Sequence, residues 1–102
     1  MMSSLHYLVF QVDPETEDWI PGYQEAAPAA LAAHGGRYLS LTPSPERLEG
    51  EGNPPSFMAI VEFPSSEAAA SFYNSDEYRP HRDARIAGAR NAAFSLVGME
   101  PS

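Results

Sequence analysis

The chain has 102 residues and a formal net charge of −8 at pH 7. It contains no cysteine, which excludes disulfides, thiol nucleophiles and thiolate metal sites. All of its basic residues are arginines, so Schiff-base chemistry on lysine is excluded too. The negative charge disfavours contact with phosphate backbones, and we expect no nucleic-acid partner. The length suits one domain, which we expect over residues 1–102.

The beginning of the chain, MMSSLHYLVF, has no basic region and only a short apolar run, unlike a signal peptide. No apolar stretch approaches the roughly 20 residues of a membrane span. We therefore expect a cytoplasmic protein with no membrane partner.

The first half of the chain predicts a strand, a helix and a second strand. Residues 5–12 are rich in β-branched and aromatic residues, and both faces of the predicted strand are largely apolar. Thr16 and Asp18 are candidate helix caps in the acidic turn that follows. Pro28 should kink the helix or mark an irregular turn. The inward face of this helix repeats at helical spacing: Trp19, Tyr23, Ala27 and Leu31.

The stretch AAHGGRYLSL, residues 32–41, predicts the junction between that helix and the next strand, because paired glycines supply the left-handed turn at a helix end. Residues 42–56, dense in proline, glycine and acids, predict an exposed connection. FMAIVEF, residues 57–63, predicts a strand with two apolar faces. Ser65 or Ser66 is expected to cap a second helix. Residues 76–90 predict a short helical piece and residues 92–99 a last strand.

The predicted order β-α-β-β-α-β is typical of the ferredoxin-like α+β fold, a four-stranded antiparallel sheet with two main helices on one face. Two helices cover only one face of the sheet, yet the strands are apolar on both. We therefore expect a homodimer in which a second copy packs sheet against sheet. The alternative is a monomer with an exposed apolar patch.

Three stretches resemble the domain-of-unknown-function 1330 family (DUF1330): HGGRYL, LEG and VEFPSSEAAASFYNSDEYRPHRDAR. The sequence departs from the family pattern at SLTPSPERLEG, where the family often has an Arg-Gly-Gly-type turn. The resemblance implies the dimeric α+β barrel version of the ferredoxin-like fold, and it implies no particular reaction.

Candidate catalytic residues come from the helix ends. His34 could serve as a general base, or its ring could cap the last turn of its helix. Tyr73 and Asn74 could direct polar groups into a cavity, or Asn74 could stop its helix in the left-handed conformation. Glu62 could accept a proton if it is buried, or lie solvated at a sheet rim.

Candidate substrate-binding residues are arginines. Arg37 could bind a carboxylate in forked geometry or pair with a surface acid. Arg82 and Arg85, with Arg79 and His81, predict a basic patch that attracts a small anion or pairs with nearby acids. The three histidines lie in separate elements without metal-ligand spacing, so we expect no metal and no cofactor.

Two function classes follow from these residues. One is a cofactor-free enzyme acting by proton transfer or oxygenation on a small carboxylated or aromatic metabolite. The other is a non-catalytic binding or accessory module, in which the same residues are helix caps and dimer pairs.

Overall fold

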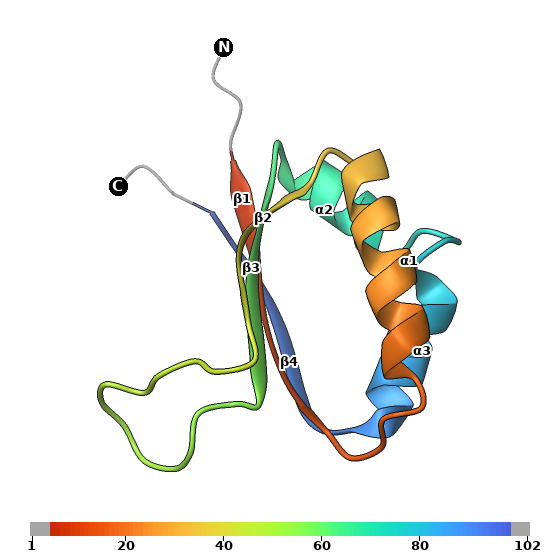
Figure 1. Cartoon of the computed structure of the whole chain (residues 1–102). Helices are drawn as coiled ribbons and strands as arrows, with labels where there is room; N and C mark the ends of the chain where they lie inside the picture. Colours follow the sequence, from red (N-terminus) through yellow and green to blue (C-terminus); the bar gives the residue numbers. More distant parts are fainter. Residues whose placement is uncertain (1–4, 99–102) are drawn as a thin grey trace.

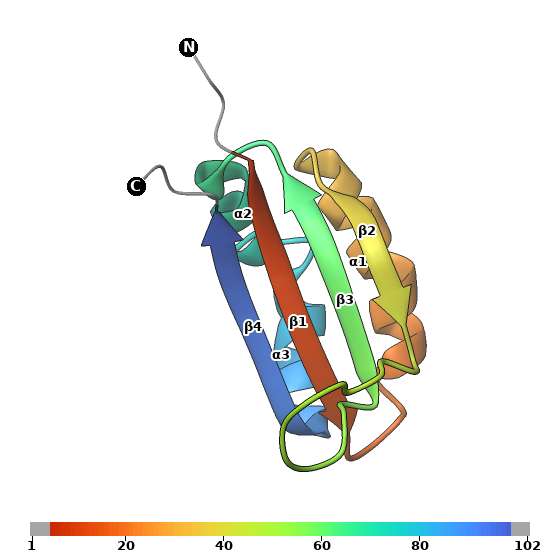
Figure 2. The same ribbon diagram turned by 90° about the vertical axis from the view of Figure 1, so that its left-hand side faces the viewer.

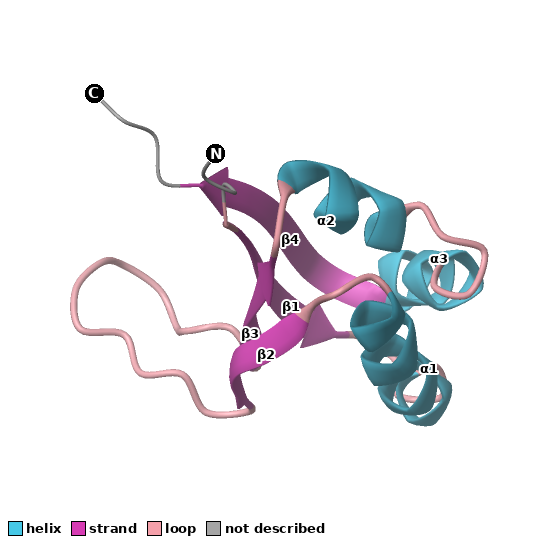
Figure 3. Cartoon of the chain, turned by 90° about the horizontal axis from the view of Figure 1, so that it is seen from above, coloured by secondary structure: helices cyan, strands magenta, loops and turns pink. Residues whose placement is uncertain are grey.

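The computed structural model describes residues 5–98. Four antiparallel strands form one sheet in the order β2-β3-β1-β4, and three helices cover one of its faces (Figures 1 and 3). The predicted ferredoxin-like α+β fold is confirmed, and the short helical piece expected over 76–90 is a helix of ten residues. The elements are β1 (His6–Pro14), α1 (Ile20–Ala33), β2 (Arg37–Thr42), β3 (Phe57–Phe63), α2 (Ser66–Tyr73), α3 (Arg79–Gly88) and β4 (Ala89–Gly98).

The core lies between the sheet and the helices. Alternate residues of β1 and β3 point toward the helices, and the register pairs Leu8 with Val61 and Phe10 with Ala59. Burying these side chains contributes about 25 cal/mol for each Å² of apolar surface removed from water. The buried residues of this core are Leu8, Phe10, Val12, Ala27, Ala30, Leu31, Ala59, Val61, Phe63, Ala69, Phe72 and Tyr78.

Helix α1 differs from its prediction at its beginning. Its N-cap is Trp19 without a side-chain hydrogen bond, so the caps expected at Thr16 or Asp18 are wrong. Pro21 lies in the first turn, where the missing N–H costs nothing. The helix continues through Pro28 to Ala33.

The ends of α1 and α2 are set by local chemistry. At the end of α1, Gly35 has φ 81° and the Gly36 N–H donates to the Leu31 carbonyl over 2.9 Å, as the paired glycines predict. Ser65 caps α2, since its Oγ accepts from the Ala68 N–H over 3.0 Å. Asn74 ends α2 with φ −103°, so the expected left-handed conformation is wrong.

The other face of the sheet carries no helix (Figure 2). The segment between β2 and β3, residues 43–56, projects on this side of the sheet (Figures 1 and 3). Asp13 holds the C-terminal end of this segment. Its carboxylate accepts from the Ser56 backbone N–H over 2.7 Å and from the Ser56 hydroxyl over 2.9 Å. We call this side of the sheet the open face; its apolar side chains include Tyr7, Val9, Met58, Ile60 and Val97.

Over residues 5–98, no helix has the length and apolar character needed to cross a bilayer.

Candidate functional site

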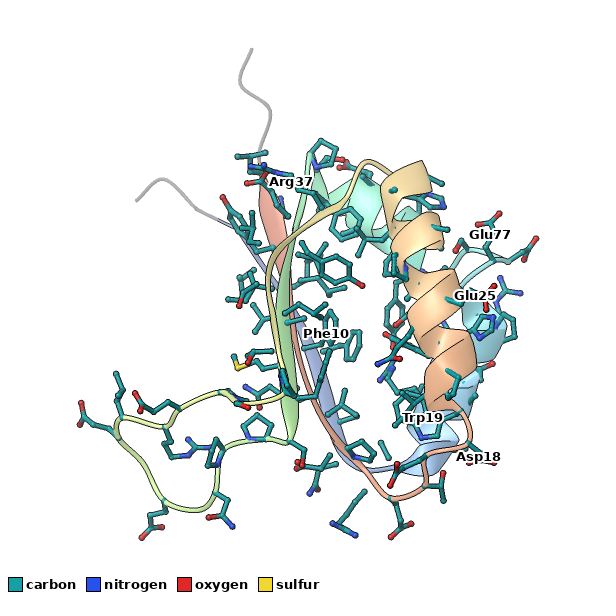
Figure 4. All side chains as sticks on the ribbon, viewed as in Figure 1. Phe10, Asp18, Trp19, Glu25, Arg37 and Glu77 are labelled. Atoms are coloured by element: carbon teal, nitrogen blue, oxygen red, sulfur yellow. The ribbon has the colours of Figure 1, made fainter. Side chains whose placement is uncertain are left out.

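A cavity of about 370 Å³ lies between the sheet and α1. Its wall is mostly apolar and aromatic, and the side chains of Phe10 and Trp19 come to it from opposite sides (Figure 4). Leu41, which is 53% exposed, and the exposed Gln24 belong to the wall, so the cavity opens to the surface between β2 and α1. Such a volume and lining are typical of a small-molecule site.

The cavity lies beneath the first part of α1: Tyr23 and Ala27 line it, whereas Ala30 and Leu31 further along the helix belong to the core beside the sheet. The beginning of α1 is fixed to the end of α3, where the Trp19 indole N–H donates to the Gly88 carbonyl over 3.3 Å. A side chain at Gly88 would collide with the Trp19 ring and with the Thr16 hydroxyl. Glycine at position 88 therefore allows the contact between the beginning of α1 and the end of α3.

Two tyrosine hydroxyls meet behind the cavity wall. The Tyr23 and Tyr78 oxygens are 2.5 Å apart, and Tyr78 is fully buried. Burial raises the pKa of both phenols, and also that of Tyr38 in the cavity wall. Phenols are protonated at neutral pH, and in the Tyr23–Tyr78 pair one hydroxyl donates to the other.

Arg85 also belongs to the cavity wall and is only 2% exposed. Its Cζ lies 3.8 Å from the centroid of the Phe94 ring, which stacks on Phe10. Its charge and a hydrogen bond lower the pKa of Tyr78, against the larger effect of burial. Its Nε and Nη2 are buried without a hydrogen-bond partner among the described residues. Arg85 is thus absent from the surface patch in which the sequence placed it.

Arg82, a second predicted substrate-binding arginine, contacts the predicted catalytic residues Tyr73 and Asn74 outside the cavity. Arg82 donates from Nη1 to the Tyr73 carbonyl over 3.1 Å and to Asn74 Oδ1 over 3.3 Å. Its guanidinium also lies 5.0 Å from the centroid of the Tyr73 ring. This cluster lies at the turn between α2 and α3, outside the lining of the cavity.

His34 lies at the end of α1, also outside the cavity lining. Its Nε2 is 3.7 Å from a carboxylate oxygen of Glu77, and its ring packs edge-on against Phe72. Backbone groups make the cap of α1, where the His34 N–H donates to the Leu31 carbonyl.

Arg37 and Glu62 form an ion pair on the open face, with Arg37 Nε 2.9 Å from Glu62 Oε1. Arg37 lies well away from Phe10 and Trp19 in Figure 4. The pairing expected for Arg37 with an acid is therefore present, and Glu62 lies on the side of the sheet opposite the cavity. Over residues 5–98, no three acidic or histidine side chains gather in a way that could hold a metal ion.

Sequence reasoning missed most of the cavity wall. Helical spacing predicts that Trp19 and Tyr23 face inward. It does not distinguish residues that line a cavity from residues that pack in the core. Tyr38 and Tyr78 carried no local pattern that marks them. The site depends on where α1 stands relative to the sheet, which is a tertiary property.

The fold is shared with solved structures of low sequence identity. RPA0582 from Rhodopseudomonas palustris, a protein of unknown function, gives a TM-score of 0.80 at 15% identity, over 97% of this chain and 85% of that chain. SnoaB, a cofactor-independent oxygenase from Streptomyces nogalater, gives 0.59 at 15% identity, over 98% and 96%. A dimeric ferredoxin-like protein of unknown function from Jannaschia sp. CCS1 gives 0.59 at 18% identity, over 95% and 99%.

These likenesses show the fold alone. No curated protein matches the chain. One family model, described as a domain of unknown function, matches residues 6–99, nearly the whole length. The resemblance carried by HGGRYL and by the stretch beginning at VEFPSS is thereby confirmed: the chain belongs to the DUF1330 family.

Proposed function

We propose that this protein is a homodimer that binds a small, largely aromatic or apolar molecule in the cavity between the sheet and α1. The observation that supports it most is the cavity itself, about 370 Å³ and walled by Trp19, Tyr23, Tyr38 and Phe57. An aromatic guest would bury its faces against these rings.

Binding is better supported than proton transfer. The cavity wall includes no carboxylate and no imidazole among residues 5–98, and burial raises the pKa of its phenols, Tyr23 and Tyr38. A general base within hydrogen-bond reach of the guest is what proton transfer would need. The oxygenase activity of SnoaB belongs to that protein, and cofactor-free oxygenation is the second function that we propose to test here. Consumption of dissolved oxygen with a bound guest would reveal it.

Ligand binding can be followed through Trp19, the single tryptophan of the chain. Because its indole belongs to the cavity wall, titration with benzyl alcohol, methyl phenylacetate or phenylacetate should change its fluorescence. A ligand present at about 100 times its Kd should add about 2.7 kcal/mol to the free energy of unfolding, measurable as a thermal shift.

Ala27→Leu should abolish both signals, because Ala27 is buried in the cavity wall and the larger side chain occupies the space of the guest. Ala29→Leu is the matched control, since Ala29 is exposed on the same helix. If no compound binds the native protein, or if Ala27→Leu binds as the native protein does, the proposed site is wrong.

The homodimer is supported by the open face. Its half-buried apolar side chains are uncovered in one chain, and a structural relative from Jannaschia sp. CCS1 is described as dimeric. Packing two such faces gives a closed two-fold assembly, as the sequence predicts.

A further inference from the structure

We infer that the guest of the cavity is an anion, and that Arg85 pairs with its carboxylate. This inference rests on the proposed function, since it names the class of molecule that the same cavity takes.

The chain has fourteen acidic residues and six arginines, yet its most buried arginine has no acidic partner. Other arginines of the chain pair with acids at the surface, where solvent screening leaves an ion pair a small contribution to stability. Within residues 5–98, Arg85 enters no ion pair, although a buried charge needs a partner most. The paired arginines are Arg37 with Glu62, Arg79 with Asp76, Arg82 with Asp83 and Arg90 with Glu15.

The two unpartnered nitrogens of Arg85 lie on one edge of the guanidinium. Nε–H and Nη2–H point in the same direction, which is the fork that matches the two oxygens of a carboxylate. The flat face of the group is already occupied by the Phe94 ring at 3.8 Å. The two N–H groups that remain free therefore lie in the plane of the guanidinium, where they can donate side by side to one carboxylate.

The side chains around Arg85 suit the apolar part of a ligand that carries a carboxylate. Phe94, which carries the guanidinium, stacks on Phe10 with ring centroids 4.5 Å apart, and Phe10 belongs to the cavity wall. An anion that enters the cavity meets in Arg85 the one charged side chain that residues 5–98 contribute to a wall that is otherwise mostly apolar and aromatic. Arg85 belongs to the cavity lining, although only 2% of its surface is exposed. A carboxylate joined to a phenyl or alkyl group satisfies both parts of the site.

The experiment compares phenylacetate, 3-phenylpropanoate and octanoate with their methyl esters, by Trp19 fluorescence and calorimetry. The acids should bind the native protein about tenfold or more tightly than the esters, because a hydrogen bond to a charged group stabilises by that order. In Arg85→Met the difference should shrink to about the scatter of the measurement, because the apolar bulk stays and the charge is lost.

The free protein gives an independent readout. Arg85→Met should raise the melting temperature in the absence of ligand, since it removes a buried charge that has no acidic partner among the described residues; a purely structural arginine would give a decrease. Arg90→Met, which removes an exposed arginine paired with Glu15 at 3.9 Å, should leave ligand selectivity unchanged.

The outcomes separate this inference from the proposed function. If esters and acids bind the native protein equally, the anion assignment is overturned while the cavity remains a binding site. If neither series binds, both fall. Selectivity for the acids that persists in Arg85→Met would assign the anion to another group and would also overturn the inference.

Discussion

At the scale of single residues, the pair of buried phenols ties α1 to α3. Tyr78→Phe removes one partner of the 2.5 Å contact and leaves the Tyr23 hydroxyl without it. Because an unsatisfied buried donor costs more than the bond itself contributes, we expect a loss of about 1–2 kcal/mol in the free energy of unfolding, measured by urea denaturation.

The matched control for that variant is Tyr38→Phe. Tyr38 is half-buried, and its hydroxyl forms no hydrogen bond with the rest of residues 5–98. Its loss should change stability by no more than about 0.5 kcal/mol. Equal effects of the two variants would mean that the contact between Tyr23 and Tyr78 contributes nothing.

The environments of single residues were the hardest feature to predict from the sequence. A cap at Ser65 or Ser66 was predictable because its chemistry is local, and Ser65 makes it, with its hydroxyl three residues before the N–H that it satisfies. The burial of Arg85 was not, because its place under Phe94 depends on contacts between α3 and β4 that no spacing in the sequence reveals.

At the scale of elements, the segment 43–56 is held at its root by Asp13. Two hydrogen bonds from Ser56, the backbone one first, lower the pKa of the Asp13 carboxyl below its ordinary value. Because the pKa of Asp13 is lower in the folded state, its carboxylate stabilises the fold at any pH above its ordinary pKa. This stabilisation is lost as the pH falls through the pKa of the folded state.

Asp13→Ala should therefore cost at most about 1 kcal/mol at pH 7, because solvent screens the site, and the cost should shrink as the pH falls toward about 3. Urea unfolding at several pH values measures this. Asp18→Ala removes an exposed acid that forms no hydrogen bond or ion pair with the described residues, and should change stability little across the range. A cost for Asp13→Ala that stays constant with pH would contradict the assignment.

Most elements were predictable from the sequence, for physical reasons. Residues 57–63 form an apolar run, interrupted only by Glu62 and followed by Pro64, and the predicted bounds of this strand are those observed. The predicted last strand, 92–99, begins three residues later than β4, because Ala89 and the residues after it have no apolar alternation that marks a strand. Met99 lies outside the described residues. The beginning of α1 was misplaced because proline and tryptophan, rather than a capping hydroxyl, set it.

At the scale of the whole molecule, one sheet has two different surroundings. One face packs under the three helices, with the cavity beneath the first part of α1; the other carries no helix (Figure 2). The sequence predicted both faces to be apolar, which is a strand property. It could not predict the cavity, because the position of α1 relative to the sheet is a tertiary property.

The open face supplies the last prediction. Ile60 lies near its centre, paired in register with Val9 on β1 and Ser40 on β2. If a second copy covers this face, Ile60→Glu places two unpaired carboxylates in an apolar interface, and the cost of burying them separates the chains. Light scattering at micromolar concentration should give twice the chain mass for the native protein and the chain mass for Ile60→Glu.

The matched control is Ile86→Glu, since Ile86 is 55% exposed on α3, on the helical side of the molecule. It introduces the same charge into an apolar position of the same type and should leave the dimer intact. Loss of the dimer in both variants would mean that added negative charge, on a chain that already carries −8, separates the copies without regard to the face. A native protein with the mass of one chain would show that the open face is left to solvent, and the sheet-to-sheet assembly would then be wrong.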